Sequence, residues 1–329
     1  MFFFLLLFGP WCRRVVARHV NGTRRLSARG LPEDTESIDP RKTGETVAIL
    51  IPIRSTNERR QKRLCSLLLS FEGWPRAQMQ VAMLVSHDSI VLVREVSQSL
   101  RSAGLGAVRI IHEPELGSRD ATTEGARHRF GAQRDRRAVI ARARNYLASH
   151  ALCHQKVDWV CWLDSDLLEV PSTLLVDLRK SDVSLVVPAC YCSGRDACGR
   201  QIYDRNSWQD TPEAREEVRR LERSGRVDDD TIIVRGYGHY RHDGHVLAIQ
   251  AAPLFLDDLK RNTPLETPLV PLDGVGATAI FLRASLHYQG LIFPPFAVNH
   301  AIESEGLAQI ALKMGVQPYG RIDIAIKHA

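Results

Sequence analysis

The stretch DWVCWLDSD, residues 158–166, decides the fold class more than any other part of the sequence. A short apolar run, residues 159–163, leads directly into two aspartates that are one residue apart. Continuous apolar runs of this length are typical of strands that are buried on both faces of a parallel sheet. In an open α/β sheet, ligands bind beyond the carboxyl ends of such strands. The stretch therefore predicts a buried strand that ends at a ligand site.

The same alternation of apolar runs and helical patterns extends in both directions from this stretch. Strands are predicted over residues 47–53, 81–86, 108–112, 158–163, 184–189, 231–235 and 278–282, and helices over residues 59–71, 90–100, 138–150, 172–179 and 212–224. Strands that alternate with helices form right-handed βαβ units. We therefore expect an α/β fold with a mostly parallel central sheet flanked by helices. The polar, glycine-containing stretch 113–137 is expected to be a mobile loop.

Composition excludes several classes of protein. The chain has 329 residues, of which 44% are hydrophobic and 25% charged, so collagen-like, coiled-coil and wholly disordered chains are excluded. Lys and Arg number 44 against 38 Asp and Glu. The arginines are scattered and no zinc or helix-turn-helix pattern accompanies them, so we expect no nucleic-acid partner. A basic balance suits a smaller anionic ligand such as a nucleotide diphosphate.

The N-terminus is predicted to direct the chain to the secretory pathway. The apolar run MFFFLLLFGPW, residues 1–11, is shorter than the roughly 20 residues that span a bilayer. Residues 1–12 are interpreted as a short signal-anchor or signal remnant that provides membrane attachment; a cleaved signal or a wrongly assigned start remains the alternative. Asn21-Gly22-Thr23 is a glycosylation sequon. Residues 13–45 are expected to form a flexible stem.

Asp164 and Asp166 suggest a metal site. Two carboxylates one residue apart can bind one hard divalent cation such as Mn²⁺ or Mg²⁺. The cation would then neutralise charge on a departing diphosphate. Solvation of the strand end is the simpler alternative.

Four other groups of residues are candidates for binding. Arg142 and Arg144 do not share a helix face, so one could reach a phosphate while the other pairs with a protein carboxylate. The loop 203–208 offers hydroxyl, amide and indole groups that suit sugar recognition. Residues 273–276, DGVG, place a carboxylate beside backbone that can approach a ligand, or form a plain turn. Residues 303–306, ESEG, are compatible with a helix start.

Taken in order, these motifs resemble a known family. They are IPIR (51–54), LVS (84–86), ARARN (141–145), W-x-D-x-D (162–166), VVP (186–188), YDxNSW (203–208), DGVG (273–276), ESEG (303–306) and I-x-H (326–328). The sequence between residues 46 and 329 resembles glycosyltransferase family 62, the GDP-mannose-dependent α-mannosyltransferases of fungal Golgi mannan polymerase complexes.

The resemblance implies a GT-A fold over residues 46–329, with a nucleotide-sugar-binding half over 46–190 and an acceptor half over 191–329. It implies Mn²⁺ as cofactor, bound by Asp164, Asp166 and His328. With the residue patterns above, it assigns donor contacts to Pro52, Arg54, Ser86, Arg142, Arg144, Asn145 and Asp164, acceptor contacts to Tyr203, Asn206 and Trp208, and catalytic carboxylates to Asp273 and Glu305. Since the chain reads Ser86-His87-Asp88 where the family tends to have Ser-Asp, one donor contact is expected to shift by a residue.

His328 is assigned by the resemblance alone, and it is followed by a single residue. A mixed oxygen and nitrogen ligand set would favour Mn²⁺ over Mg²⁺. The alternative is that the two aspartates bind the metal alone and the C-terminus is a frayed tail.

The resemblance predicts a retaining α-mannosyltransferase that transfers mannose from GDP-mannose to a mannose-containing glycan. A front-face route is favoured because the sequence shows no clear nucleophile; a two-step route would need a carboxylate at the anomeric carbon. The expected location is the Golgi membrane, as a type II protein with a lumenal catalytic domain and other mannosyltransferase subunits as partners. The alternative function is a non-catalytic subunit that binds glycan or stabilises such a complex.

Overall fold

The computed structural model describes residues 39–54, 57–85, 90–112, 130–153, 156–192, 202–233, 235, 251–264, 266 and 268–329. The predicted signal-anchor, the sequon and most of the predicted stem lie outside these residues. The end of that stem, Pro40–Thr43, forms a single helical turn, α2. No helix in the described part of the chain combines the length and the apolarity needed to cross a bilayer.

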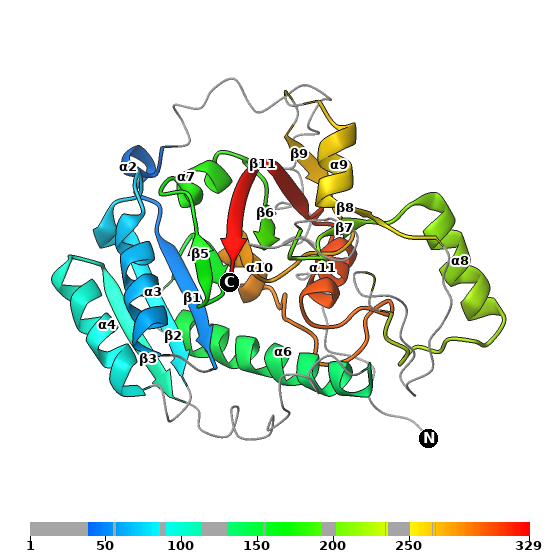
Figure 1. Ribbon diagram of the computed structural model, residues 1–329, viewed down its shortest axis with the longest axis horizontal. Coiled ribbons are helices and arrows are strands. Elements are labelled where there is room, and N and C mark those ends of the chain that lie inside the picture. The colour runs from blue at the N-terminus through cyan, green and yellow to red at the C-terminus, as the bar shows by residue number, and fades with distance from the viewer. Residues whose placement is uncertain are drawn as a thin grey trace, which may run out of the picture. The chain divides into compact units, whose positions relative to one another are not determined.

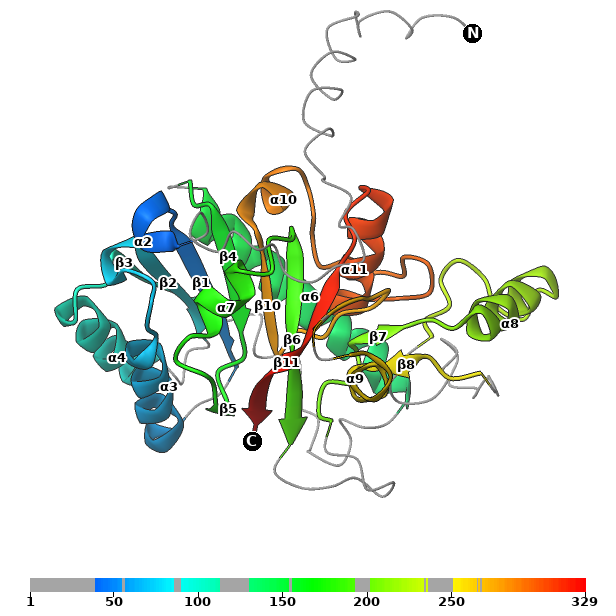
Figure 2. The same cartoon turned by 90° about the horizontal axis from the view of Figure 1, so that it is seen from above.

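A central mixed sheet organises the described residues (Figures 1 and 2). Its strands, in spatial order, are β3 (Ala107–His112), β2 (Met79–Val85), β1 (Val47–Ile53), β4 (Trp159–Leu163), β10 (Ala279–Arg283), β6 (Leu185–Cys192), β11 (Tyr319–His328) and β5 (Leu167–Glu169), and β9 (Leu269–Pro271) pairs with β11. The pairs that join β3, β2, β1 and β4 are parallel, as is β6 with β11. The α/β class with a large central sheet flanked by helices is therefore confirmed. The sheet is mixed, because β10 is antiparallel to β4 and β6, and β5 and β9 are antiparallel to β11.

Helices cover both faces of this sheet. They are α3 (Glu58–Ser70), α4 (Ile90–Ser102), α6 (Phe130–Leu152), α7 (Leu174–Arg179), α9 (Leu256–Asn262), α10 (Ala284–Tyr288) and α11 (Glu303–Lys313), with a 3₁₀ turn η3 over Arg76–Gln78. A two-stranded sheet of β7 (Trp208–Gln209) and β8 (Leu254–Phe255) lies beside them. Helix α8 (Pro212–Arg223) stands away from the central sheet in both views (Figures 1 and 2). Successive strand residues point to opposite faces, so the core divides in two. Ile49 and Cys161 pack with α3, α4 and α7, whereas Leu50 and Trp162 pack with α6, α10 and α11.

The deepest part of the core lies where β4 meets β10. Trp159 and Phe281 are fully buried, and their rings stack with centroids 4.9 Å apart. The guanidinium groups of Arg179 and Arg283 lie 4.8 and 4.5 Å from the centroid of the Trp159 ring. This stack fixes the strand that leads into Asp164.

Two expectations about local structure were wrong. Residues 130–137 belong to α6 rather than to a loop. Arg137 in this polar segment forms a buried ion pair with Glu305, and such tertiary contacts stabilise helices of modest intrinsic propensity. The described residues of the predicted strand 231–235 form no strand, because the N–H of Ile233 donates to the carbonyl of His300 in a loop.

The last strand, β11, was missed. Its alternating buried residues, Ile322, Ile324 and Ile326, carry the two-residue period of a strand. The pattern was present in the sequence, but the segment lies far along the chain from the strands it pairs with.

Replacing Phe281 with Ala is expected to lower the free energy of unfolding by about 3–5 kcal/mol, since it leaves a cavity against Trp159. The matched control is Phe296→Ala, because Phe296 is 52% exposed; it should cost less than about 0.5 kcal/mol. Urea unfolding of both variants measures the difference. Equal losses would contradict this description of the core.

Candidate metal centre

The metal centre begins where β4 ends. The five residues of β4 are buried, and the chain then turns through Asp164 and Asp166 before β5 begins at Leu167. The Asp164 N–H donates to the carbonyl oxygen of Thr278 over 3.0 Å, which fixes the start of the turn. Both aspartates are partly exposed.

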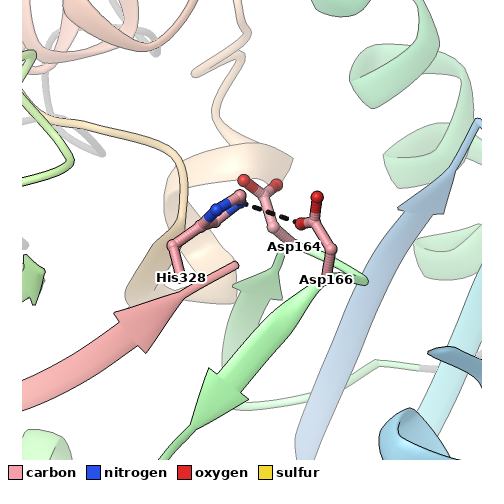
Figure 3. A group of neighbouring side chains, drawn as sticks. All are labelled: Asp164, Asp166 and His328. Carbon is pink, nitrogen blue, oxygen red and sulfur yellow. Dashed lines mark ion pairs between the residues drawn. The ribbon is translucent and has the colours of Figure 1, made fainter. Parts of the chain in front are cut away.

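The third candidate ligand, His328, lies at the end of strand β11. Strand β11 lies between β6 and β5, and His328 pairs with Leu167 in β5 and with Cys192 in β6. Because Leu167 directly follows Asp166 in the chain, this register brings the imidazole beside the aspartate turn. Figure 3 shows the three side chains converging from the two segments.

The three side chains fit a divalent cation. One ligand atom each from Asp164, Asp166 and His328 lie within 4.8 Å of one another, and His328 Nε2 is 2.9 Å from Asp166 Oδ1. Two carboxylates and one imidazole form the donor set that suits Mn²⁺ among the biological hard cations. The chemistry of the donor set therefore fits the expected cofactor, and the identity of the ion stays a prediction.

The imidazole of His328 is well held rather than frayed. The residue is 6% exposed, and the Tyr203 ring stacks on it at 3.8 Å with an interplanar angle of 9°. Its Nδ1 lies 3.1 Å from the main-chain oxygen of Ala329. Both this oxygen and the Asp166 Oδ1 that lies 2.9 Å from Nε2 accept hydrogen bonds, so the ring donates from both nitrogens and Nε2 must release its proton to bind a metal.

The three groups perturb one another's protonation. Burial raises the pKa of Asp164 to about 6, although the nearby charge of Arg144 opposes this shift. Burial would raise the pKa of Asp166, but the hydrogen bond and charge of His328 outweigh it and lower that pKa. Burial lowers the pKa of His328, but the hydrogen bond and charge of Asp166 outweigh it and raise that pKa.

Helix α6 brings three of the expected donor contacts to different places. Arg144 is buried and its Nη2 donates to Asp164 Oδ1 over 3.0 Å, whereas Arg142 is exposed. Arg144 therefore pairs with a protein carboxylate, as expected for one of the two arginines, and the contact of Arg142 with a phosphate stays a prediction. Asn145 donates to the carbonyl oxygen of Phe293 over 2.7 Å and accepts from its N–H over 2.9 Å, so it fixes the chain before α11.

Two of the other expected donor contacts lie at the carboxyl end of β1. Pro52 is half-buried within β1, and Arg54 is exposed just beyond that strand. Ser86, the third of them, lies outside the described residues. The carboxyl ends of β1 and β4 meet at one edge of the sheet, since these strands pair in parallel.

The loop 202–208 and the loop 273–278 interlock. Thr278 donates from Oγ1 to Asp204 Oδ2 over 2.8 Å, so the Asp204 carboxylate is tied beside the residue that also fixes Asp164. A Cβ at Gly276 would lie 1.8 Å from this carboxylate, and one at Gly274 would lie 2.4 Å from the Trp208 ring. Both glycines in DGVG therefore make room for side chains of the YDxNSW motif.

The expected acceptor contacts differ in accessibility. Trp208 is 3% exposed and its indole N–H donates to Glu305 Oε1 over 2.7 Å. Asn206 accepts from Arg137 through its amide oxygen over 3.0 Å. Tyr203, by contrast, is 37% exposed while it stacks on His328.

The expected catalytic carboxylates are held by protein donors. Asp273 Oδ2 accepts from the Asp210 N–H over 2.8 Å and from Arg215 Nη2 over 2.9 Å. Glu305 is 1% exposed and pairs with Arg137, and burial raises its pKa. Through Arg137 and the Trp208 indole, the structure brings Glu305 together with Asn206 and Trp208. Asp273 is joined to this group because its N–H donates to the carbonyl oxygen of Trp208.

Three residues near the site were not singled out from sequence: Asp204, Arg137 and Glu303. Asp204 lies inside the YDxNSW motif, so its position in the motif was the available signal. Arg137 had been placed in a loop. Glu303 opens α11, and its Oε1 lies 3.3 Å from Arg144 Nε; nothing in its local sequence distinguishes it from Glu305.

Binding of Mn²⁺ is expected to weaken by roughly tenfold between pH 7.5 and pH 5.5. The ligands must be unprotonated; burial raises the pKa of Asp164 to about 6, within this range, and the hydrogen bond to Asp166 raises the pKa of His328 above its usual value, so protons compete with the cation. Binding should therefore strengthen as pH rises through 6 to 7. Electron paramagnetic resonance of free Mn²⁺ measures the affinity, with circular dichroism to verify folding at each pH. Equal affinities at both values would exclude this ligand set.

Comparisons with known proteins agree with the motifs. A family model described as Anp1 matches residues 27–297. The mannan polymerase complex subunit mnn9 of Schizosaccharomyces pombe is 32% identical over 296 residues, which are 87% of this chain and 80% of that protein. The mannan polymerase II complex anp1 subunit of the same organism is 36% identical over 203 residues, which are 61% of this chain and 44% of that protein.

Among solved structures, the chain is similar to the mannosyltransferase PcManGT from Pyrobaculum calidifontis in complex with GDP-Man and Mn²⁺. The TM-score is 0.44 and the identity 13%, over 97% of this chain and 64% of that one. The family match ends at residue 297, so α11 and β11 lie beyond it. Since the match covers most of the chain, the resemblance is confirmed, and the chain belongs to the Anp1 family.

Proposed function

We propose that this chain is a metal-dependent retaining α-mannosyltransferase that transfers mannose from GDP-mannose to a mannose-containing glycan. The observation that carries the proposal is the cluster of Asp164, Asp166 and His328 at the carboxyl end of a buried strand. Membership of the Anp1 family supports a role in glycosyl transfer, since the matched relatives are named as subunits of mannan polymerase complexes. The mixed sheet, with ligand residues at the edge where β1 and β4 end, suits the expected GT-A arrangement.

The proposed mechanism assigns separate tasks to the residues around the cluster. Asp164, Asp166 and His328 would hold Mn²⁺, which when bound neutralises charge on the diphosphate leaving group. Arg144 donates to one oxygen of Asp164 and so orients this carboxylate. Its Nη1 is buried and has no hydrogen-bond partner among the described residues, so a ligand or an ordered water would satisfy it.

The contacts of the nearby carboxylates favour a front-face route. A two-step route needs a carboxylate free to attack the anomeric carbon. Asp204 is held by Thr278, Glu305 by Arg137 and Trp208, and Asp273 by Arg215. Any of these carboxylates would have to break its hydrogen bonds to these donors before it could attack as a nucleophile. The front-face route needs only the ion pair between the sugar cation and the departing diphosphate.

The acceptor would approach over the loop 202–208. Tyr203 is the accessible member of this loop, and its ring touches the His328 imidazole. An acceptor sugar that contacts Tyr203 would therefore lie next to the metal ligands. Asn206 and Trp208 would act indirectly, by fixing the conformation of this loop, since their polar groups are hydrogen-bonded to Arg137 and Glu305.

We further propose that the chain assembles with other mannosyltransferase subunits, as its relatives' names indicate for them. The proposed location is the Golgi membrane, with the N-terminal apolar run as a type II anchor and the catalytic domain in the lumen. Carbonate extraction of the native protein tests the anchor, and release into the supernatant would argue against it.

Asp166→Asn is expected to lower mannose transfer by at least about 100-fold, because it removes a metal ligand and the charge that attracts the cation. The assay combines purified protein, GDP-mannose, Mn²⁺ and a mannobiose acceptor, with product linkage determined by NMR. The matched control is Asp229→Asn, an exposed aspartate far along the chain from the cluster, which should transfer at the wild-type rate.

Two outcomes would contradict the proposal. If wild type neither transfers mannose nor hydrolyses GDP-mannose, the non-catalytic alternative gains support. If Asp166→Asn retains wild-type activity, the enzyme does not depend on this metal site.

A further inference from the structure

Glu303 combines two features that rarely occur together. It is the first residue of α11 and has a φ of 57°, in the left-handed region where a residue with a side chain is strained. It is also a charged residue that is only 6% exposed. Strained and buried charged residues concentrate at functional sites.

The carboxylate of Glu303 is connected to the metal centre through one guanidinium. Its Oε1 lies 3.3 Å from Arg144 Nε, and Arg144 Nη2 donates to Asp164 Oδ1 over 3.0 Å. Arg144 also lies 5.7 Å from the Trp162 ring centroid and 5.4 Å from that of Phe293. The guanidinium is therefore held between two carboxylates and two rings.

The neighbouring carboxylate of the same motif has a different partner. Glu305 pairs with Arg137 and accepts from the Trp208 indole, so it stabilises the loop 202–208. Of the two glutamates in ESEG, Glu303 is the one that contacts Arg144 in the described structure. The family resemblance had assigned a catalytic carboxylate to Glu305 and no role to Glu303.

We propose that Glu303 is a positioning residue for the metal centre. It fixes the Arg144 guanidinium so that Nη2 occupies Oδ1 of Asp164 and leaves Oδ2 for a divalent cation. This inference rests on the metal site of the proposed function. A glycine would adopt the backbone conformation of residue 303 without strain. What the glutamate contributes at this strained position is its carboxylate.

Loss of the Glu303 charge should weaken cation binding for two reasons that act in the same direction. It removes a negative charge from the surroundings of the site. It also leaves Asp164 as the only carboxylate that compensates the charge of Arg144 in this arrangement. The guanidinium of Arg144 would then compete more strongly with the cation for Asp164.

The test compares Glu303→Gln and Glu303→Asn by Mn²⁺ titration followed with electron paramagnetic resonance. Both variants should bind Mn²⁺ about tenfold more weakly, at the lower end of the loss seen when a direct partner of a metal ligand is removed, because Glu303 acts through Arg144. Both lose the same charge, but asparagine tolerates the left-handed region. Glu303→Asn should therefore melt at a higher temperature than Glu303→Gln, while both lose Mn²⁺ affinity equally; a purely structural role would make the loss of affinity follow the loss of stability.

The matched control is Asp182→Asn, because Asp182 is another non-glycine residue with positive φ, 49°, whose side chain is 47% exposed and pairs with Arg179. It should leave Mn²⁺ affinity unchanged. Wild-type affinity in both Glu303 variants, or an equal loss in Asp182→Asn, would overturn the inference. Since the readout is Mn²⁺ affinity, a wild-type protein that binds Mn²⁺ but does not use GDP-mannose would refute the proposed function and leave this inference standing.

Discussion

The candidate site depends on the pairing of β11 with β5. Two segments more than 150 residues apart in sequence meet there, since His328 lies opposite Leu167, which follows Asp166 directly. A one-residue slip of this register would turn the imidazole to the other face of the sheet. The parallel pairing of β11 with β6 on its other edge, where His328 lies opposite Cys192, holds the register. The metal ligands are therefore a consequence of strand register.

Buried charge surrounds these ligands. Arg144 and Arg137 each pair with a glutamate of the ESEG motif, and the carboxylate of Asp204 lies beside Thr278. Burial raises the pKa of Asp204 and of Glu305, because desolvation penalises the charged form. Removing one partner from such a group leaves the other charge buried and uncompensated, which is costly. The arrangement thus gives the acids of the loop motifs a structural role in this protein.

The sequence was sufficient for the parts of the fold that local patterns determine. The apolar run before Asp164, the helices α3 and α4, and the aspartate pair itself follow from periodicity and from the position of carboxylates at a strand end. His328 came only from the family resemblance, because an isolated histidine near a terminus has no distinguishing local pattern. The Anp1 match stops before this residue, so the structure supplies the independent observation.

What local patterns could not predict depends on long-range contacts. The first turns of α6 are polar, and the ion pair of Arg137 with Glu305 stabilises them as a helix. The strain at Glu303 and its contact with Arg144 appear only once α11 packs beside α6. The hydrogen bonds of Asn145 to Phe293 and of Trp208 to Glu305 likewise join distant segments, and the expected ligand contacts of these two residues stay predictions.

The most direct test of the account is whether β11 delivers a metal ligand. Mn²⁺ affinity should be measured by isothermal titration calorimetry for wild type, His328→Ala and the adjacent control Lys327→Ala, each with and without GDP. The account predicts that His328→Ala binds Mn²⁺ roughly 10- to 100-fold more weakly and that Lys327→Ala binds as wild type does. It also predicts that GDP tightens binding in wild type, because the diphosphate adds oxygen ligands. Equal affinities for wild type and His328→Ala would show that the two aspartates act without the C-terminal strand.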